Sequence, residues 1–386
     1  MSAFLSKFIK SAMVLILTAY FAIAGLFLPP DKGELLLAEY MEKTLNYPQK
    51  DNAFPYNLKG LKDVHITQAL SGPYSINNTK INYNVYGADL GIVFDKGDEL
   101  FFAFGDTFSQ AEFGGNWRSN VLAVSKDRDA SDGILFDRMV TKPLGWSAKE
   151  LIPSLKKDGE EMTTIPTGGF SVGDDMYLCY MSVRTWGDPG IWWCSYGSMA
   201  KSTDGGNNWT KLPELQWSGD GKFVQLCPVK QGGYIYFFAV QGGRTGQVNL
   251  MRVPEAQVEN RAAYEYLIER PEGGQPVYQT GAWAEENAMT VIDAPAGELS
   301  VMYNEYLGEW LISYQHNADL ILRSAKTIEG PYSDYHYIAK QEDFPGLYCA
   351  FMHPVYTEEN GRIVYFIMSL WNPIYNAVIV KAEMLR

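Results

Sequence analysis

The sequence predicts an all-β protein, specifically a five-bladed β-propeller, and three observations carry this prediction. From about residue 63 onward, apolar residues alternate with a period of two, and long helical patterns are scarce. A short apolar strand followed by a turn also recurs along the chain, as expected for a repeat architecture. Its five copies begin at Val121, Met199, Leu250, Ile321 and Val378. An open β-sandwich is the alternative fold.

The third observation is the stretch "STDGGNNW", Ser202–Trp209, which continues the second copy. It fits the Asp-box pattern S-x-D-x-G-x-x-W, a hairpin turn found on the outer strands of propeller blades. Short polar side chains in such turns bond their own backbone, and the tryptophan packs between sheets. We therefore expect Asp204 to be structural.

The N-terminal residues 1–30 have the composition of an export signal. Lys7 and Lys10 precede an apolar run over residues 12–28, and Ala22-Ile23-Ala24 offers a small-residue cleavage site. The run is long for a signal peptide and short for a membrane span, so a cleaved signal and an uncleaved anchor both remain open. Either predicts a secreted or cell-envelope protein, with residues 12–28 as a membrane tether in the second case.

The rest of the chain divides into two parts. Residues 31–62 read as a short amphipathic helix followed by a polar linker, and residues 63–386 as the propeller, which we expect to be the catalytic domain. The propeller is thus preceded by an N-terminal hydrophobic helix and a short linker.

Charge and composition restrict the partners. The formal net charge of −13 argues against a nucleic-acid partner, whereas aromatic residues, at 14% of the chain, can stack on an uncharged glycan. The four cysteines lack C-x-x-C spacing; Cys179 and Cys194 could pair after export, or all four could be buried thiols. The histidines form no visible metal cluster, so we expect neither a metal nor a cofactor.

The stretch "YGADLGIVFDKGDELFFAFGDTF", Tyr86–Phe108, predicts the inner hairpin of the first blade. A turn over residues 95–98 pairs Phe94 with Glu99, and counting outward pairs Asp89 with Phe104. Asp106 is then diagonal to Asp89 on the same sheet face, with their Cα atoms roughly 7–8 Å apart. A three-residue loop would shift this register by one.

Two carboxylates on one face are what glycoside hydrolysis requires. One protonates the leaving oxygen, and the other attacks the anomeric carbon or activates a water molecule. Asp89 and Asp106 are therefore the candidate catalytic residues. In the alternative reading, Asp89 caps a bulge and Asp106 bonds the turn after its strand.

Several motifs together resemble a bacterial family long described as a domain of unknown function, some members of which are endo-D-arabinanases. The resemblance runs from about Ile66 to the C-terminus through "GADLG", "AFGDTF", "WRSNVLAVS", "IPTGGFSVG", "YMSVRTWGDPGIWW", "LSVMYNEYLGEWLI" and "FPGLYCAFMHP". It implies a five-bladed propeller that cleaves the D-arabinan of mycobacterial cell walls. It also implies Asp89 as acid/base and Asp106 as nucleophile of a retaining mechanism. Ala88 stands where members often have threonine.

The remaining motif residues are predicted to contact the polysaccharide, either by stacking on a sugar or by bonding its hydroxyls. They are Arg118, Asn120, Arg184, Trp186, Tyr303, Asn304 and His353. Glu305 is the substitute if one aspartate proves structural.

Two other functions remain open. One is a furanosidase for another pentose glycan such as L-arabinan, and the other is a non-catalytic glycan-binding surface propeller. A sialidase is disfavoured because the sequence lacks the early R-I-P motif.

Overall fold

The computed structural model describes residues 32–49, 55–372 and 374–386. The expected signal or anchor at residues 1–30, with the tether at 12–28, lies outside this part. The described part begins with helix α2 (Lys32–Met41), which lies within residues 31–62. Within the described part, none of the helices is both long and apolar enough to cross a bilayer.

The fold is nearly all-β. The largest sheet has nine strands, in the order β20-β22-β23-β2-β3-β4-β5, with β1 paired to β23 and β21 to β22. Its strands are β1 (Gly60–Ala69), β2 (Gly87–Lys96), β3 (Glu99–Phe108), β4 (Val121–Ser125), β5 (Arg138–Met139), β20 (Leu347–Phe351), β21 (Thr357–Glu358), β22 (Ile363–Leu370) and β23 (Asn376–Leu385).

Three smaller sheets follow along the chain. The first is β6 (Thr163–Val172), β7 (Asp175–Trp186), β8 (Trp192–Ser202) and β9 (Thr210–Ser218). The next is β10 (Gln225–Gln231), β11 (Tyr234–Val240), β12 (Gly246–Pro254), β13 (Glu265–Glu269) and β14 (Val277–Thr280), with β15 (Thr290–Ala296) on β12. The last is β16 (Leu299–Asn304), β17 (Glu309–His316), β18 (Asp319–Ala325) and β19 (His336–Ala339). The short helices are α3 (Thr79–Tyr83), α4 (Ala282–Glu286), η1 (Glu255–Gln257), η2 (Arg261–Ala263) and η3 (Glu359–Gly361).

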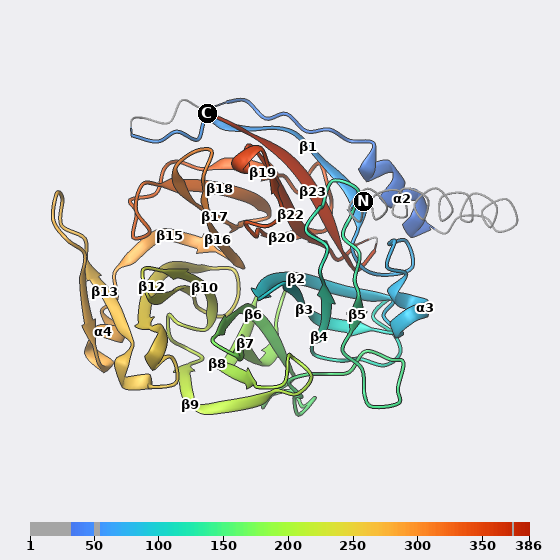
Figure 1. Cartoon of the computed structure of the whole chain (residues 1–386), viewed down its shortest axis with the longest axis horizontal. Coiled ribbons are helices and arrows are strands. Elements are labelled where there is room, and N and C mark those ends of the chain that lie inside the picture. The colour runs from blue at the N-terminus through green and yellow to red at the C-terminus, as the bar shows by residue number, and fades with distance from the viewer. Residues whose placement is uncertain (1–31, 50–54, 373) are drawn as a thin grey trace, which may run out of the picture.

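The sheets are arranged around a common centre (Figure 1). Strand β2 contacts β6, β6 contacts β10, β10 contacts β16, β16 contacts β20, and β20 contacts β2, so these inner strands close a ring. The five repeat copies lie on β4, β8, β12, β18 and β23, each of which has strand neighbours on both sides. The repeat therefore marks the same kind of position around the ring.

The Asp box forms the turn between β8 and β9, as predicted. Asp204 Oδ1 accepts hydrogen bonds from Ser202 Oγ (2.9 Å) and from the backbone N–H of Asn208 (2.8 Å), and Trp209 packs against the core. All four cysteines lie in the described part and are buried free thiols, so Cys179 and Cys194 are not paired.

The segment predicted as a linker ends earlier than expected. Strand β1 begins at Gly60 and pairs in antiparallel register with β23, next to the C-terminus. The end of residues 31–62 therefore belongs to the largest sheet, because β23 would otherwise present an unpaired edge there.

Candidate active site

The hairpin β2–β3 carries both candidate aspartates, but its register differs from the predicted one. Lys96 pairs with Glu99, so the turn is the two-residue Gly97-Asp98 rather than residues 95–98, and Gly97 has the positive φ (65°) that such turns favour. The predicted pairing of Asp89 with Phe104 is wrong, because Leu90 takes that place.

Two register shifts in the hairpin lie next to Asp89, between Ala88 and Leu90 and between Leu90 and Ile92. Ala88 pairs with Thr107 and Leu90 with Phe104, so Asp89 faces the segment Gly105-Asp106. Both aspartates line the same pocket, and the charge of Asp106 acts on Asp89. A Cβ added at Gly105 would lie 2.5 Å from Asp89 Oδ1, so only glycine leaves room for this carboxylate.

Asp89 lies in a poorly solvated place at the base of a pocket. The Tyr348 hydroxyl donates to its Oδ2 (2.7 Å), while its buried Oδ1 has no hydrogen-bond partner among the described residues. Burial and the charge of Asp106 raise the pKa of Asp89 to about 7, although the hydrogen bond from Tyr348 and the nearby hydroxyl of Tyr375 lower it. This carboxyl is suited to hold a proton near neutral pH.

Asp106 is better supplied with donors. The indole N–H of Trp117 and the hydroxyl of Thr163 both donate to its Oδ1, each at 2.7 Å. Burial raises the pKa of Asp106 to about 6, while these hydrogen bonds and the cation of Lys156 oppose the rise. None of the hydrogen bonds among the described residues uses its Oδ2, which leaves that oxygen for a ligand.

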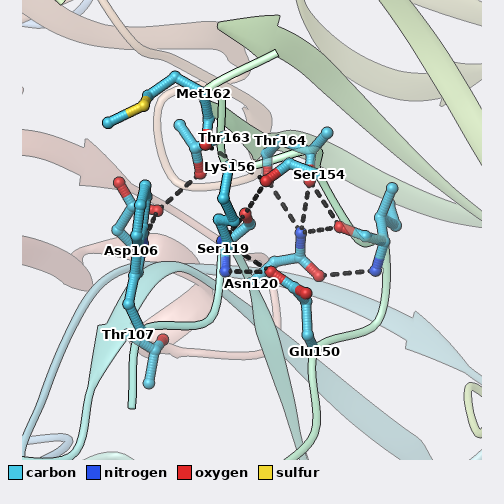
Figure 2. Close-up of polar contacts among 12 residues, drawn as sticks. Asp106, Thr107, Ser119, Asn120, Glu150, Ser154, Lys156, Met162, Thr163 and Thr164 are labelled. Carbon is cyan, nitrogen blue, oxygen red and sulfur yellow. Dashed lines mark hydrogen bonds and ion pairs between the residues drawn. The ribbon is translucent and has the colours of Figure 1, made fainter. Parts of the chain in front are cut away.

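Lys156 lies next to Asp106 within a polar cluster (Figure 2). Its Nζ stands 4.0 Å from the centre of the Trp117 ring, forms an ion pair with Glu150 (2.8 Å) and donates to Ser119 Oγ. The ammonium therefore holds the indole that bonds Asp106, in addition to its own electrostatic effect.

Two strained backbone positions flank the bond between Asp89 and Tyr348. Leu90 and Cys349, which follow them in sequence, have φ of 67° and 44°. Ser369 Oγ on β22 accepts from the backbone N–H of Leu90 (2.8 Å) and from the Cys349 thiol (3.2 Å). Non-glycine residues in this conformation concentrate at functional sites.

The aspartates line a pocket of about 390 Å³ at one end of the ring. Exposed apolar side chains stand at its rim, namely Phe113, Trp186, Ile191 and Trp371. Its wall also holds an ion pair, in which Arg244 Nη2 lies 2.7 Å from Glu298 Oε1. The pocket is thus largely apolar with a few placed polar groups, as ligand sites are.

A second pocket of about 770 Å³ shares Thr167, Cys227, Leu299 and Phe351 with the first and extends away from the aspartates. It is lined by Tyr303, Glu305 and His353, and the His353 Nε2 lies 3.5 Å from Asp95. These predicted residues are therefore grouped together, but apart from Asp89 and Asp106.

Of the predicted substrate contacts, Trp186 alone lines the aspartate pocket. Arg118 is buried and donates to the carbonyls of Ala148 and Asn84. The Asn120 amide bonds only backbone groups and Thr164, and the Asn304 amide bonds Leu307 and Gly361. Arg184 lies on β7 outside the residues that line either pocket. These bonds give Arg118, Asn120 and Asn304 structural partners.

Sequence reasoning did not single out several residues of this site. They are Trp117, Lys156, Thr163, Arg244, Glu298, Tyr348 and Tyr375. Trp117 and Tyr348 stand inside the motifs "WRSN" and "FPGLYCAF", so their ability to donate to a carboxylate was the available signal. Within the described residues, no group of histidine, cysteine, aspartate and glutamate side chains is arranged to hold a metal ion.

Several solved structures are similar to this chain. A putative hydrolase from Bacteroides ovatus ATCC 8483 has a TM-score of 0.56 at 13% identity, over 87% of this chain and 96% of that one, which shows a shared fold. A family 117 glycoside hydrolase from Zobellia galactanivorans has a TM-score of 0.44 at 13% identity, over 83% and 90%. A family 32 β-fructofuranosidase from Bombyx mori also scores 0.44 at 13% identity, over 80% and 64%.

The family follows from the sequence itself. Residues 74–381 match the family described as a domain of unknown function, DUF4185, and the chain belongs to this family. No curated protein matches the sequence.

Proposed function

We propose that the protein is a glycoside hydrolase that uses Asp89 as its acid/base and Asp106 as its nucleophile. The observation that carries this proposal is the facing pair at the pocket base with unequal hydrogen bonding. Asp106 Oδ1 accepts two hydrogen bonds, which favour the carboxylate, whereas Asp89 has one partnered oxygen. Burial raises both pKa values, that of Asp89 to about 7 and that of Asp106 to about 6. Two neighbouring carboxyls whose environments give them different pKa values are typical of an acid and a nucleophile.

The reaction proceeds in two displacements. Asp106 Oδ2 attacks the anomeric carbon while the Asp89 carboxyl gives its proton to the departing glycosidic oxygen, so one C–O bond forms and another breaks. Asp89, now ionised, takes a proton from water, whose oxygen attacks the same carbon and releases Asp106. The proton returned to Asp89 completes the cycle.

The proposed mechanism is retaining, because Asp106 acts as a nucleophile rather than as a base for water. Retaining enzymes hold their carboxyl groups about 5–5.5 Å apart, whereas inverting enzymes need roughly 6.5–9.5 Å. The observed register places Asp106 in the segment that faces Asp89, nearer than the diagonal position predicted from the sequence, and this supports the shorter separation.

The substrate that we propose is a D-arabinofuranosyl polymer of mycobacterial type, cleaved internally. The motif resemblance supports the sugar, and the exposed aromatic rim of Phe113, Trp186 and Trp371 supports stacking of several units across the pocket mouth. The net charge of −13 suits an uncharged chain. The proposal includes export to the cell envelope, where such a polymer would be met.

We further propose that the fold is a five-bladed propeller. The nine-stranded sheet would comprise two blades, β2-β3-β4-β5 and β20-β22-β23-β1. Among the described strands, the backbone pairing that joins them is the parallel pair of Ala88 with Asn376. With the three smaller sheets, each blade then begins on the inner ring and carries one repeat copy on its third strand.

The test is incubation of the full chain with mycobacterial arabinogalactan, followed by analysis of released oligosaccharides. Asp106→Asn and Asp89→Asn are expected to lower the rate at least about a thousandfold and a hundredfold, respectively. Asp98→Asn, at the exposed tip of the same hairpin, is the matched control and should remain active. Glycan binding without cleavage by the wild type would instead identify a binding module, and cleavage of L-arabinan alone would change the sugar.

A further inference from the structure

The pocket contains an ion pair that the proposed chemistry does not use. Arg244 Nε donates to both Glu298 oxygens (3.1 and 3.0 Å), and its Nη2 donates to Oε1 (2.7 Å). The side chains are only 19% and 10% exposed, and both line the aspartate pocket. Moving two charges out of water costs more than most such pairs recover, so stability alone is a weak reason to keep one.

Arg244 is held from several sides. Its guanidinium lies over the rings of Trp192 (5.4 Å) and Tyr348 (5.0 Å), and its backbone N–H donates to the carbonyl of Gly190 (3.0 Å). Tyr348 is also the residue whose hydroxyl donates to Asp89. The Tyr348 ring therefore lies between the ion pair and the proposed acid/base. None of the hydrogen bonds among the described residues uses Arg244 Nη1.

Gln225 adds an acceptor to the same wall. Its Nε2 donates to the carbonyls of Gln241 (2.9 Å) and Gly243 (2.8 Å), which fixes the amide in one orientation. Its Oε1 is buried and has no partner among the described residues, although Gln225 lines the pocket. A buried acceptor without a donor carries a desolvation penalty that a ligand hydroxyl would remove.

The chemistry of this group selects a kind of ligand. A carboxylate only accepts hydrogen bonds and a guanidinium only donates them, whereas a hydroxyl does both. Two neighbouring hydroxyls can therefore bond Glu298 and Arg244 together, one donating to the carboxylate and the other accepting from the guanidinium. The pair is neutral as a whole, so it favours an uncharged ligand over an anion or a cation.

We propose that Arg244, Glu298 and Gln225 form a subsite that binds the vicinal diol of the sugar unit next to the cleaved bond. This inference rests on the proposed function, because it assigns part of the same pocket to the substrate. Charge-assisted hydrogen bonds to the diol would orient the furanose ring, so that its anomeric carbon faces Asp106. The three residues are then determinants of which pentose is accepted.

The chain contains a second ion pair that serves as the control for the pair of Arg244 and Glu298. Arg252 Nε lies 2.7 Å from Glu265 Oε2, and the Arg252 guanidinium lies 3.7 Å from the ring centre of Tyr278. Neither Arg252 nor Glu265 lines the aspartate pocket. This pair has the same chemistry and a similar aromatic setting, but Arg252 lines a different pocket, together with Arg270 and Glu329.

The experiment measures binding of a linear D-arabinofuranose oligosaccharide, and of its 2-deoxy analogue, by calorimetry to the full-length Asp106→Asn protein. Adding Glu298→Gln is expected to weaken binding of the parent sugar about tenfold or more. It should also remove most of the preference over the deoxy analogue, which a structural role would not change. Adding Glu265→Gln should leave both affinities within about twofold. Arg244→Lys, which keeps the charge but loses the planar fork, gives a second test if Glu298→Gln is poorly folded.

The outcomes are distinct. Unchanged affinity and unchanged deoxy discrimination in folded Glu298→Gln or Arg244→Lys would overturn the subsite while leaving the proposed function intact. If the Asp106→Asn protein binds no arabinose oligosaccharide and the wild type releases none, the proposed function fails and the subsite with it. Equal losses in Glu298→Gln and Glu265→Gln would show a general effect of breaking ion pairs, which also overturns the subsite.

Discussion

Replacing Asp89 by asparagine is expected to stabilise the protein, and to do so more at pH 8 than at pH 5. The pKa of Asp89 is raised from 3.8 to about 7 in the folded protein by burial and by Asp106. The native state therefore binds this proton more tightly than the unfolded chain, and stability is lost as pH rises from about 4 to about 7. The asparagine amide does not ionise in this range, so the variant does not lose this stability as the pH rises.

The size of the effect follows from the same pKa. From pH 5 to about pH 7 the folded carboxyl keeps a proton that the unfolded chain has already lost, and each of these two pH units corresponds to about 1.4 kcal/mol. The upper limit is about 3 kcal/mol, which partial access of solvent reduces to about 1 to 3 kcal/mol. With an unfolding entropy of about 2.1 cal/mol/K per residue over 386 residues, this corresponds to about 1 to 4 °C in Tm.

The measurement is the difference in Tm between Asp89→Asn and wild type at pH 5, 6, 7 and 8. Taking the difference at each pH removes effects of the substitution that do not depend on protonation, such as the changed bond from Tyr348. Asp98→Asn, whose carboxylate is exposed and paired with Lys126, is the control and should not gain stability with pH. A difference that is constant or falls from pH 5 to pH 8 would refute the raised pKa.

Two predictions concern activity. The pH dependence of kcat/KM should be bell-shaped with an optimum between about 6 and 7, because Asp106 must be ionised and Asp89 protonated; a rate that rises steadily to pH 9 would contradict the assignment. Lys156→Met should move the acidic limb up by about one pH unit, since Lys156 opposes the effects of Glu150 and burial on Asp106. The control is the neighbouring Lys157→Met, which removes an exposed ion pair with Glu160. A lower kcat/KM with an unchanged acidic limb would show that the role of Lys156 is only structural.

The sequence predicts the strands and the Asp box well, because alternation and turn residues act locally. It does not predict the register at Asp89, since the shifts there depend on Ser369 and on the room left at Gly105. It also groups Asn120 and Asn304 with the site, because an asparagine that bonds backbone carbonyls looks the same in sequence as one that bonds a sugar. Their environment becomes visible only in three dimensions.

The contrast between the two aspartates reflects where their partners come from. Asp106 is bonded by Trp117, eleven residues away in sequence, and by Thr163 on the next inner strand. Asp89 depends on Tyr348 and Tyr375, more than two hundred residues away, where the last segments of the chain meet the first hairpin. The carboxyl proposed as the acid/base is therefore buried where the last strands of the chain meet its first hairpin. The burial that raises its pKa depends on the assembly of β2 with β20 and β22, whereas the carboxylate proposed as the nucleophile is held by residues nearer to it in the sequence.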